Sequence, residues 1–133
     1  AACLLETAKV IVEDNLGDYY TELRGVKAGS LLEELDDLST ETWFKGLVEN
    51  SVAFIMLTRC GIDPMDYFSG EDFAHAYDFD TPETLSILGG AVSDIAEMPL
   101  REIATTVLSL YRAEQGKIAH LTEILTGSIM VAG

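Results

Sequence analysis

Residues 41–60 read ETWFKGLVENSVAFIMLTRC, and this stretch decides the fold class of the chain. Apolar residues recur in it every three or four positions, which is the period of an amphipathic helix. Its middle, residues 52–57, is apolar on nearly every face, and a helix of that kind usually lies inside a core. We therefore predict a helix over residues 41–60 at the centre of the structure, capped by Ser39 or Thr40. The side chains expected to be mostly buried are Trp43, Leu47, Phe54 and Ile55.

A stop signal follows this helix directly. Gly61 suits the left-handed backbone that closes many helices, and Ile62 can then fold back on Leu57. Cys60 ends the apolar stretch and is expected to be a small buried hydrophobe. Asp63-Pro64 predicts a further short helical turn, with Asp as the cap and Pro at the first helical position.

The residues before this helix also have helical periodicity. Apolar side chains at helical spacing predict one helix over residues 4–23, which Gly17 weakens by about 1 kcal/mol without breaking it. Ser30 and Glu33 form the pattern of a capping box, which predicts a short second helix running to Leu38.

The residues after it predict further helices. Thr81-Pro82-Glu83 is a helix start, and Leu85, Leu88, Val92 and Ile95 are expected on one face of the helix that follows. Because proline removes a hydrogen-bond donor, Met98-Pro99 should kink or restart the chain. Gly116 should separate the next two helices and Gly127 should end the last. Residues 128–133 are expected to form a tail that docks through Ile129, Met130 and Val131.

Together these segments predict an all-α fold, a single compact bundle of about six helices around a central apolar helix. The length of 133 residues fits one domain over residues 1–133. No apolar run reaches the roughly 20 residues of a membrane span, so we expect no membrane insertion. The chain opens at Ala1 without Met and without a signal-peptide pattern, and we interpret it as a piece of a longer protein.

The charge of the chain limits its partners. Eight Lys and Arg face 23 Asp and Glu, which gives a net charge of −15. Such a surface repels phosphate backbones and anionic membranes, so we expect no direct nucleic-acid binding. The acidity favours solubility or a partner that is itself basic. Two cysteines, Cys3 and Cys60, are too few for a disulfide framework and indicate a reducing, cytoplasmic setting. A single disulfide between them is the alternative.

Motifs that carry chemistry are absent from the sequence. The only histidines are His75 and His120, so the chain lacks the His-Glu-x-x-His pattern of zinc hydrolases. Gly89-Gly90 lacks the lysine and hydroxyl of a phosphate-binding loop. We therefore assign no catalytic residue, cofactor or metal. The one cluster with oxygen and nitrogen ligands is better interpreted as a solvated acidic turn, and its members are Asp72, His75, Asp78 and Asp80.

The distribution of charge is the most unusual feature. No Lys or Arg lies between Arg59 and Arg101, whereas residues 63–97 hold nine acids interleaved with aromatic residues. This combination is a candidate surface for a protein partner, either a basic protein or another domain of a parent chain. The alternative, which we favour, is that the aromatic residues anchor an irregular segment to the core. The candidate surface comprises Asp72, His75, Tyr77, Asp78, Phe79 and Asp80, with Asp78 and Asp80 at its centre.

The predicted helix over residues 41–60 and the turn that follows it resemble part of a known protein family. Residues 49–54, Glu-Asn-Ser-Val-Ala-Phe, and the turn Gly61-Ile62-Asp63 resemble the helix after the zinc motif in ArdC/LtrC-type antirestriction proteins, which are zincin-like proteins of conjugative plasmids and transposons. Residues 79–97 resemble segments of large multidomain proteins of mobile elements, and the resemblance covers residues 43–112. In that family a glutamate ligand precedes Ser-Val-Ala-Tyr, but Asn50 stands there in this chain. The resemblance therefore implies a mobile-element context and no catalytic residue.

Three functions are consistent with these patterns. The first is a non-catalytic helical module that acts through protein contacts. The second is part of a zincin-like metallopeptidase whose remaining ligands lie outside this chain, which predicts that Glu49 faces a polar groove. The third is an acidic DNA mimic, which requires carboxylates in rows at phosphate-like spacing. We expect the first.

Overall fold

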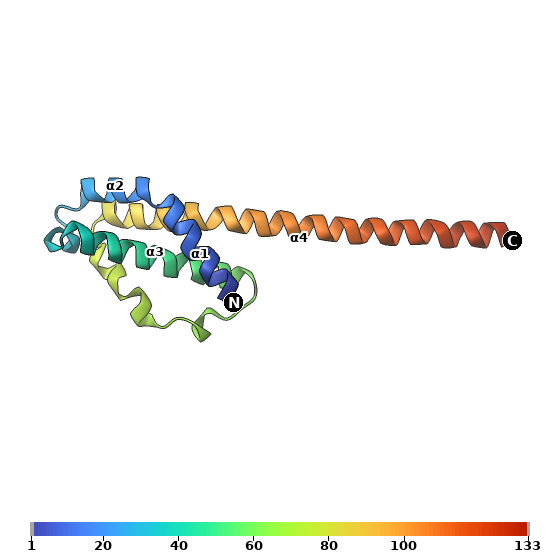
Figure 1. Ribbon diagram of the computed structural model, residues 1–133, viewed down its shortest axis with the longest axis horizontal. Coiled ribbons are helices and arrows are strands. Elements are labelled where there is room, and N and C mark those ends of the chain that lie inside the picture. The colour runs from blue at the N-terminus through green and yellow to red at the C-terminus, as the bar shows by residue number, and fades with distance from the viewer. Residues whose placement is uncertain (1, 133) are drawn as a thin grey trace. The chain divides into compact units, whose positions relative to one another are not determined.

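The computed structural model describes the backbone of residues 2–132 and the side chains of residues 2–126. The described elements are all helical, which confirms the all-α class (Figure 1). The α-helices are α1 (Ala2–Asn15), α2 (Gly17–Val26), α3 (Asp37–Arg59) and α4 (Pro82–Ala132), and the short 3₁₀ helices are η1 (Leu31–Glu34), η2 (Pro64–Asp66) and η3 (Gly70–Asp78).

The chain divides into two compact units after Met98. The first unit holds α1, α2, α3, the three 3₁₀ helices and the beginning of α4. The second unit begins at Pro99 and is the remainder of α4. No helix in the described part of the chain has both the length and the apolar composition to cross a membrane.

The single helix expected over residues 4–23 is two helices, so that prediction is wrong. α1 ends at Asn15 and α2 begins at Gly17, with a change of direction between them (Figure 1). The Asn15 side-chain amide donates a hydrogen bond to the carbonyl oxygen of Ile11 at 2.8 Å. A polar side chain that bonds back in this way competes with the helix, and glycine has poor helix propensity. Asn15 and Gly17, with only Leu16 between them, therefore end the helix.

The start of α3 also differs from the expectation. The Ser30 hydroxyl caps η1 by accepting the N–H of Leu32 at 3.2 Å, but η1 ends at Glu34 and does not reach Leu38. Asp36 caps α3, because its carboxylate accepts the N–H of Ser39 at 2.6 Å. The predicted caps Ser39 and Thr40 are therefore inside the helix.

α3 packs against α1, α2, η2 and η3. Of the four residues expected to be mostly buried, Leu47 is buried, whereas Trp43, Phe54 and Ile55 are partly exposed. Further residues of α3 that are buried are Thr40, Phe44, Val48, Val52, Ala53, Met56 and Leu57.

The end of α3 follows the prediction. Gly61 has a φ of 76°, and the N–H of Ile62 donates to the carbonyl of Leu57 at 2.9 Å, as the left-handed helix end requires. Asp63 then caps η2 by accepting the N–H of Met65 at 2.9 Å. Cys60 is exposed and its thiol is free, contrary to the expected burial, because the helix ends there and the chain turns away from the core.

α4 is one continuous helix, so the expected interruptions are wrong. Thr81 caps it as predicted, its hydroxyl accepting the N–H of Thr84 at 3.2 Å. The helix then continues through Pro99, Gly116 and Gly127 to Ala132. Proline costs a helix about 3 kcal/mol and glycine about 1 kcal/mol, which hydrogen bonds on both sides can offset. The bundle of about six helices is not confirmed, and the expected contacts of Ile129, Met130 and Val131 lie outside the described side chains.

Candidate interaction surface

Residues 63–80 lie along α3 and are held to it by specific contacts. The side-chain amide of Asn50 donates to the carbonyl oxygen of Asp72 at 3.1 Å. The rings of Phe73 and Phe54 form a T-shaped pair with centroids 5.7 Å apart, and the rings of Phe73 and Phe68 are tilted with centroids 5.8 Å apart. Asn50, in the position where the resemblance places a metal ligand, therefore holds the backbone of η3.

The helical period of η3 determines which of its side chains face α3. A 3₁₀ helix has three residues per turn, so residues three apart share a face. Phe73, Ala76 and Phe79 follow this spacing and face α3, whereas Glu71 and Tyr77 are exposed. Phe79 is 2% exposed, and its ring centroid lies 5.9 Å from that of Phe44.

Three residues of the predicted surface therefore serve the fold. Phe79 is a core side chain and cannot contact a partner in this structure. The carboxylate of Asp80 accepts the N–H of Leu31 at 3.0 Å and ties the end of η3 to η1. The carboxylate of Asp72 accepts the N–H of Ser69 at 2.8 Å, which caps η3.

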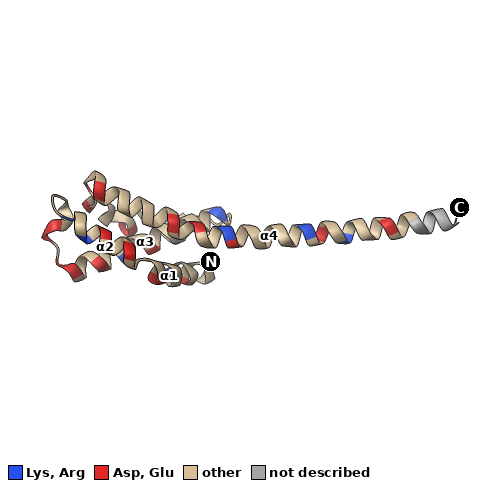
Figure 2. Ribbon diagram, turned by 90° about the horizontal axis from the view of Figure 1, so that it is seen from above, with Lys and Arg blue, Asp and Glu red and all other residues tan. Residues whose placement is uncertain are grey.

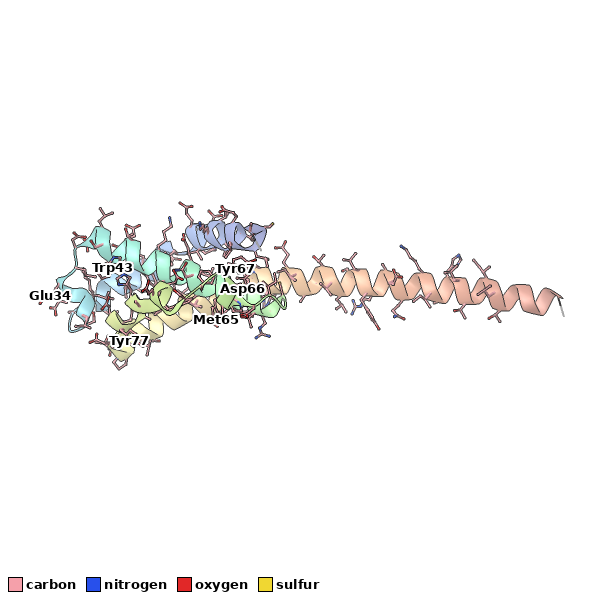
Figure 3. The ribbon with its side chains drawn as sticks, turned by 90° about the horizontal axis from the view of Figure 1, so that it is seen from below. Glu34, Trp43, Met65, Asp66, Tyr67 and Tyr77 are labelled. Carbon is pink, nitrogen blue, oxygen red and sulfur yellow. The ribbon has the colours of Figure 1, made fainter. Side chains whose placement is uncertain are left out.

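The other predicted residues do come together at the surface. The rings of Trp43 and His75 are stacked, with centroids 3.9 Å apart and planes 20° apart. His75 Nδ1 lies 3.3 Å from the Asp78 carboxylate. Tyr77 is 84% exposed and extends away from η3 (Figure 3). Trp43, expected in the core, thus forms part of this surface instead.

A second group lies at η2, where the predicted segment 63–97 included Asp66 and Tyr67 but sequence reasoning missed Met65. Met65 is 64% exposed and Tyr67 is 47% exposed, and Asp66 lies between them (Figure 3). The signal was the Asp63-Pro64 turn, which fixes a short helix too small to bury all of its side chains. We call the exposed and partly exposed residues of both groups the acidic-aromatic surface, which consists of Trp43, Met65, Asp66, Tyr67, Glu71, His75, Tyr77 and Asp78.

An apolar hollow adjoins this surface. It has a volume of about 300 Å³ and is lined by Ser51, Phe54 and Ile55 of α3 and by Phe73 of η3. Its lining explains why Phe54 and Ile55 are only partly buried. A hollow of this kind can receive one apolar side chain of a partner.

The net negative charge of the chain comes from the first unit. Beyond Met98 the chain carries three cations and three acids, so the whole net charge of −15 belongs to the first 98 residues. Figure 2 shows Asp and Glu distributed over the helices of that unit. In the described residues, no group of three or more His, Cys, Asp or Glu is arranged to hold a metal ion.

Glu49 lies among charged residues where α3 meets α1. Burial raises the pKa of its carboxyl above the usual value, and nearby Lys45 and Lys9 offset part of that increase. Lys45 is itself 3.5 Å from the carboxylate of Glu13. The ionised form of Glu49 is therefore disfavoured in the folded protein.

We expect Glu49→Gln to stabilise the protein near neutral pH. Because the pKa is raised in the folded state, folding favours the protonated carboxyl, and the stability due to this group rises as the pH falls through that pKa. The thermal midpoint of the variant should exceed that of the wild type at about pH 7, and the difference should shrink towards about pH 4. A constant difference at all pH values would show that the carboxyl does not titrate as described.

Comparison with family models, curated proteins and solved structures gives no match.

Proposed function

We propose that this chain is a non-catalytic helical module that acts through protein contacts, and that its acidic-aromatic surface binds a basic partner. One observation carries the proposal. Tyr77 and Met65 are 84% and 64% exposed within a segment that has nine acids and no Lys or Arg, while Phe79 of the same segment is buried. Exposed aromatic residues on a segment held by buried anchors are typical of binding surfaces.

The parts of the surface divide the work of recognition. The acids attract a basic partner and orient it, because an excess of one charge creates a local field. The Trp43–His75 stack and Tyr77 supply flat apolar area that can be desolvated, which charge alone does not provide. The hollow beside Phe73 gives an apolar side chain of the partner a place to insert.

The mobile-element context of the module rests on the resemblance of residues 43–112 to ArdC/LtrC-type proteins. The role of Asn50 supports the non-catalytic form of the proposal, since its amide holds the carbonyl of Asp72. The metallopeptidase alternative predicts Glu49 in a polar groove, and its charged neighbours are Lys45, Lys9 and Glu13. The two lysines beside this carboxylate repel a metal ion, which disfavours that alternative. The cytoplasmic location and the lack of nucleic-acid binding are part of the proposal and rest on composition.

Selection from a random peptide library displayed on phage tests the binding function. We expect the enriched peptides to combine Lys or Arg with an apolar residue. Their binding should weaken as salt is raised, because exposed charges are screened beyond about 8 Å at physiological ionic strength.

Two variants locate the binding site. Asp66→Asn, Glu71→Gln and Tyr77→Ser together should abolish peptide capture, since these exposed side chains make none of the contacts that anchor the segment. Asp14→Asn with Glu22→Gln, two exposed acids of α1 and α2, should leave capture unchanged. Enrichment of acidic or neutral peptides, or capture that survives in the triple variant, would contradict the proposal.

A further inference from the structure

The second unit has an apolar stripe with a regular spacing. The stripe positions are separated by four, three, four, four, three and four residues, which is an eleven-residue repeat. Eleven residues complete three turns at 3.67 residues per turn, so the stripe stays on one side of a nearly straight helix. The stripe consists of Ile103, Val107, Leu110, Glu114, Ile118, Leu121 and Leu125.

Most of this stripe is exposed in the described part of the second unit. Val107 is 59% exposed, Leu110 66%, Ile118 50% and Leu121 58%. A row of large apolar side chains in water is unfavourable, and such rows usually mark an interface.

The stripe has a symmetry that fits a second copy of the same helix. Counted outward from Glu114, the apolar positions lie four, seven and eleven residues away in both directions. In an antiparallel pair centred on Glu114, Leu110 of one copy faces Ile118 of the other, and Val107 faces Leu121. We propose that α4 pairs with α4 of a second copy of this chain, antiparallel, through residues 103–125. A two-fold interface requires this kind of self-complementarity, because the same patch serves both partners.

The distribution of charge supports a second copy as the partner. Residues from Pro99 onward carry no net charge, so two such helices do not repel each other despite the −15 of the whole chain. All of the excess acids precede Pro99 in the sequence. In an antiparallel pair the two Pro99 junctions, where the acidic units join the helices, lie at opposite ends, whereas in a parallel pair both junctions lie at one end.

Glu114 is the one polar residue in the stripe. At the centre of the pair it faces Glu114 of the second copy. Lys117 lies three residues further along the helix, within reach of both carboxylates. A single polar position of this kind lowers stability but fixes register, as buried polar residues do in coiled coils.

The charges of this helix argue against a membrane surface as the partner of the stripe. Helices that lie on membrane surfaces carry Lys and Arg on their polar face. The polar face of this helix mixes Arg101 and Arg112 with Glu123, and the preceding unit is strongly acidic.

Analytical ultracentrifugation of the full chain over a range of concentrations tests the pairing. The wild type should be a dimer that dissociates on dilution. Leu110→Gln with Ile118→Gln should raise the dissociation constant at least about a hundredfold, because two central apolar layers are lost. Thr105→Gln with Ala119→Gln, on the opposite face of the same helix, should leave it unchanged. Glu114→Leu should lower it about tenfold, a gain that misfolding cannot produce.

Disulfide trapping tests the direction. In a Cys3→Ser, Cys60→Ser background, a mixture of Val107→Cys and Leu121→Cys chains should form a crosslinked heterodimer. Val107→Cys alone should not crosslink, since the two copies of that position are about 21 Å apart along an antiparallel pair. Crosslinking of Val107→Cys with itself would overturn the antiparallel arrangement. A monomer at all concentrations, or a monomer that binds vesicles of phosphatidylglycerol and phosphatidylcholine, would overturn the proposal as a whole.

Discussion

Phe79→Ala is expected to destabilise the first unit by about 3–5 kcal/mol. The side chain is 2% exposed and packs with Phe44, which is fully buried. Its removal leaves a cavity and also frees the end of η3, which Asp80 joins to η1. Since small proteins are stable by only about 5–15 kcal/mol in total, this loss should be plain in urea unfolding.

Tyr77→Ala is the matched control for Phe79→Ala. It removes an aromatic ring two residues before Phe79, at the end of η3, but from a side chain that is 84% exposed. Its effect on the free energy of unfolding should stay within about 0.5 kcal/mol. Equal losses from the two variants would mean that η3 is not turned as described, and that Phe79 is not the anchor of the acidic-aromatic surface.

Leu88→Ala is expected to cost about 2–5 kcal/mol, whereas Leu85→Ala should cost less than about 0.5 kcal/mol. Both leucines are in the first turns of α4, but Leu88 is 7% exposed and Leu85 is 56% exposed. Next to Leu88 in the core are Ala91 and Ile95 of the same helix. Urea unfolding of the two variants gives both values.

These two variants test whether Leu85 belongs to the buried face of α4. Helical spacing placed Leu85 and Leu88 on one face without saying how far that face is buried, and in the structure Leu88 is buried whereas Leu85 is exposed. A large loss from Leu85→Ala would support the wider apolar face and contradict the described position of α4.

Helix ends were predictable where one local interaction decides them. The left-handed backbone at Gly61, the Asp63-Pro64 turn and the Thr81 cap each depend on a few neighbouring atoms, and all three are found in the structure. The break at Leu16 and the continuity through Pro99 were not predictable. There, costs of about 1–3 kcal/mol compete with many helical hydrogen bonds, and a pattern does not give the balance.

The candidate surface was found by composition but not in detail. Acids and aromatic residues without cations are visible in the sequence, whereas the period of three residues per turn in η3 is not. That period buries Phe79 and exposes Tyr77, and it brings His75 onto Trp43 of a distant helix. Met65 was missed because a single exposed methionine has no distinguishing pattern.

Chemical-shift mapping tests the proposed binding surface most directly. The isotope-labelled chain is titrated with a basic peptide enriched by the library selection, and its amide shifts are followed by nuclear magnetic resonance at low and high salt. We predict that the largest shifts fall on residues 64–78 and around Trp43, and that high salt suppresses them. Shifts confined to α1 and α2, with residues 64–78 unchanged, would contradict the account.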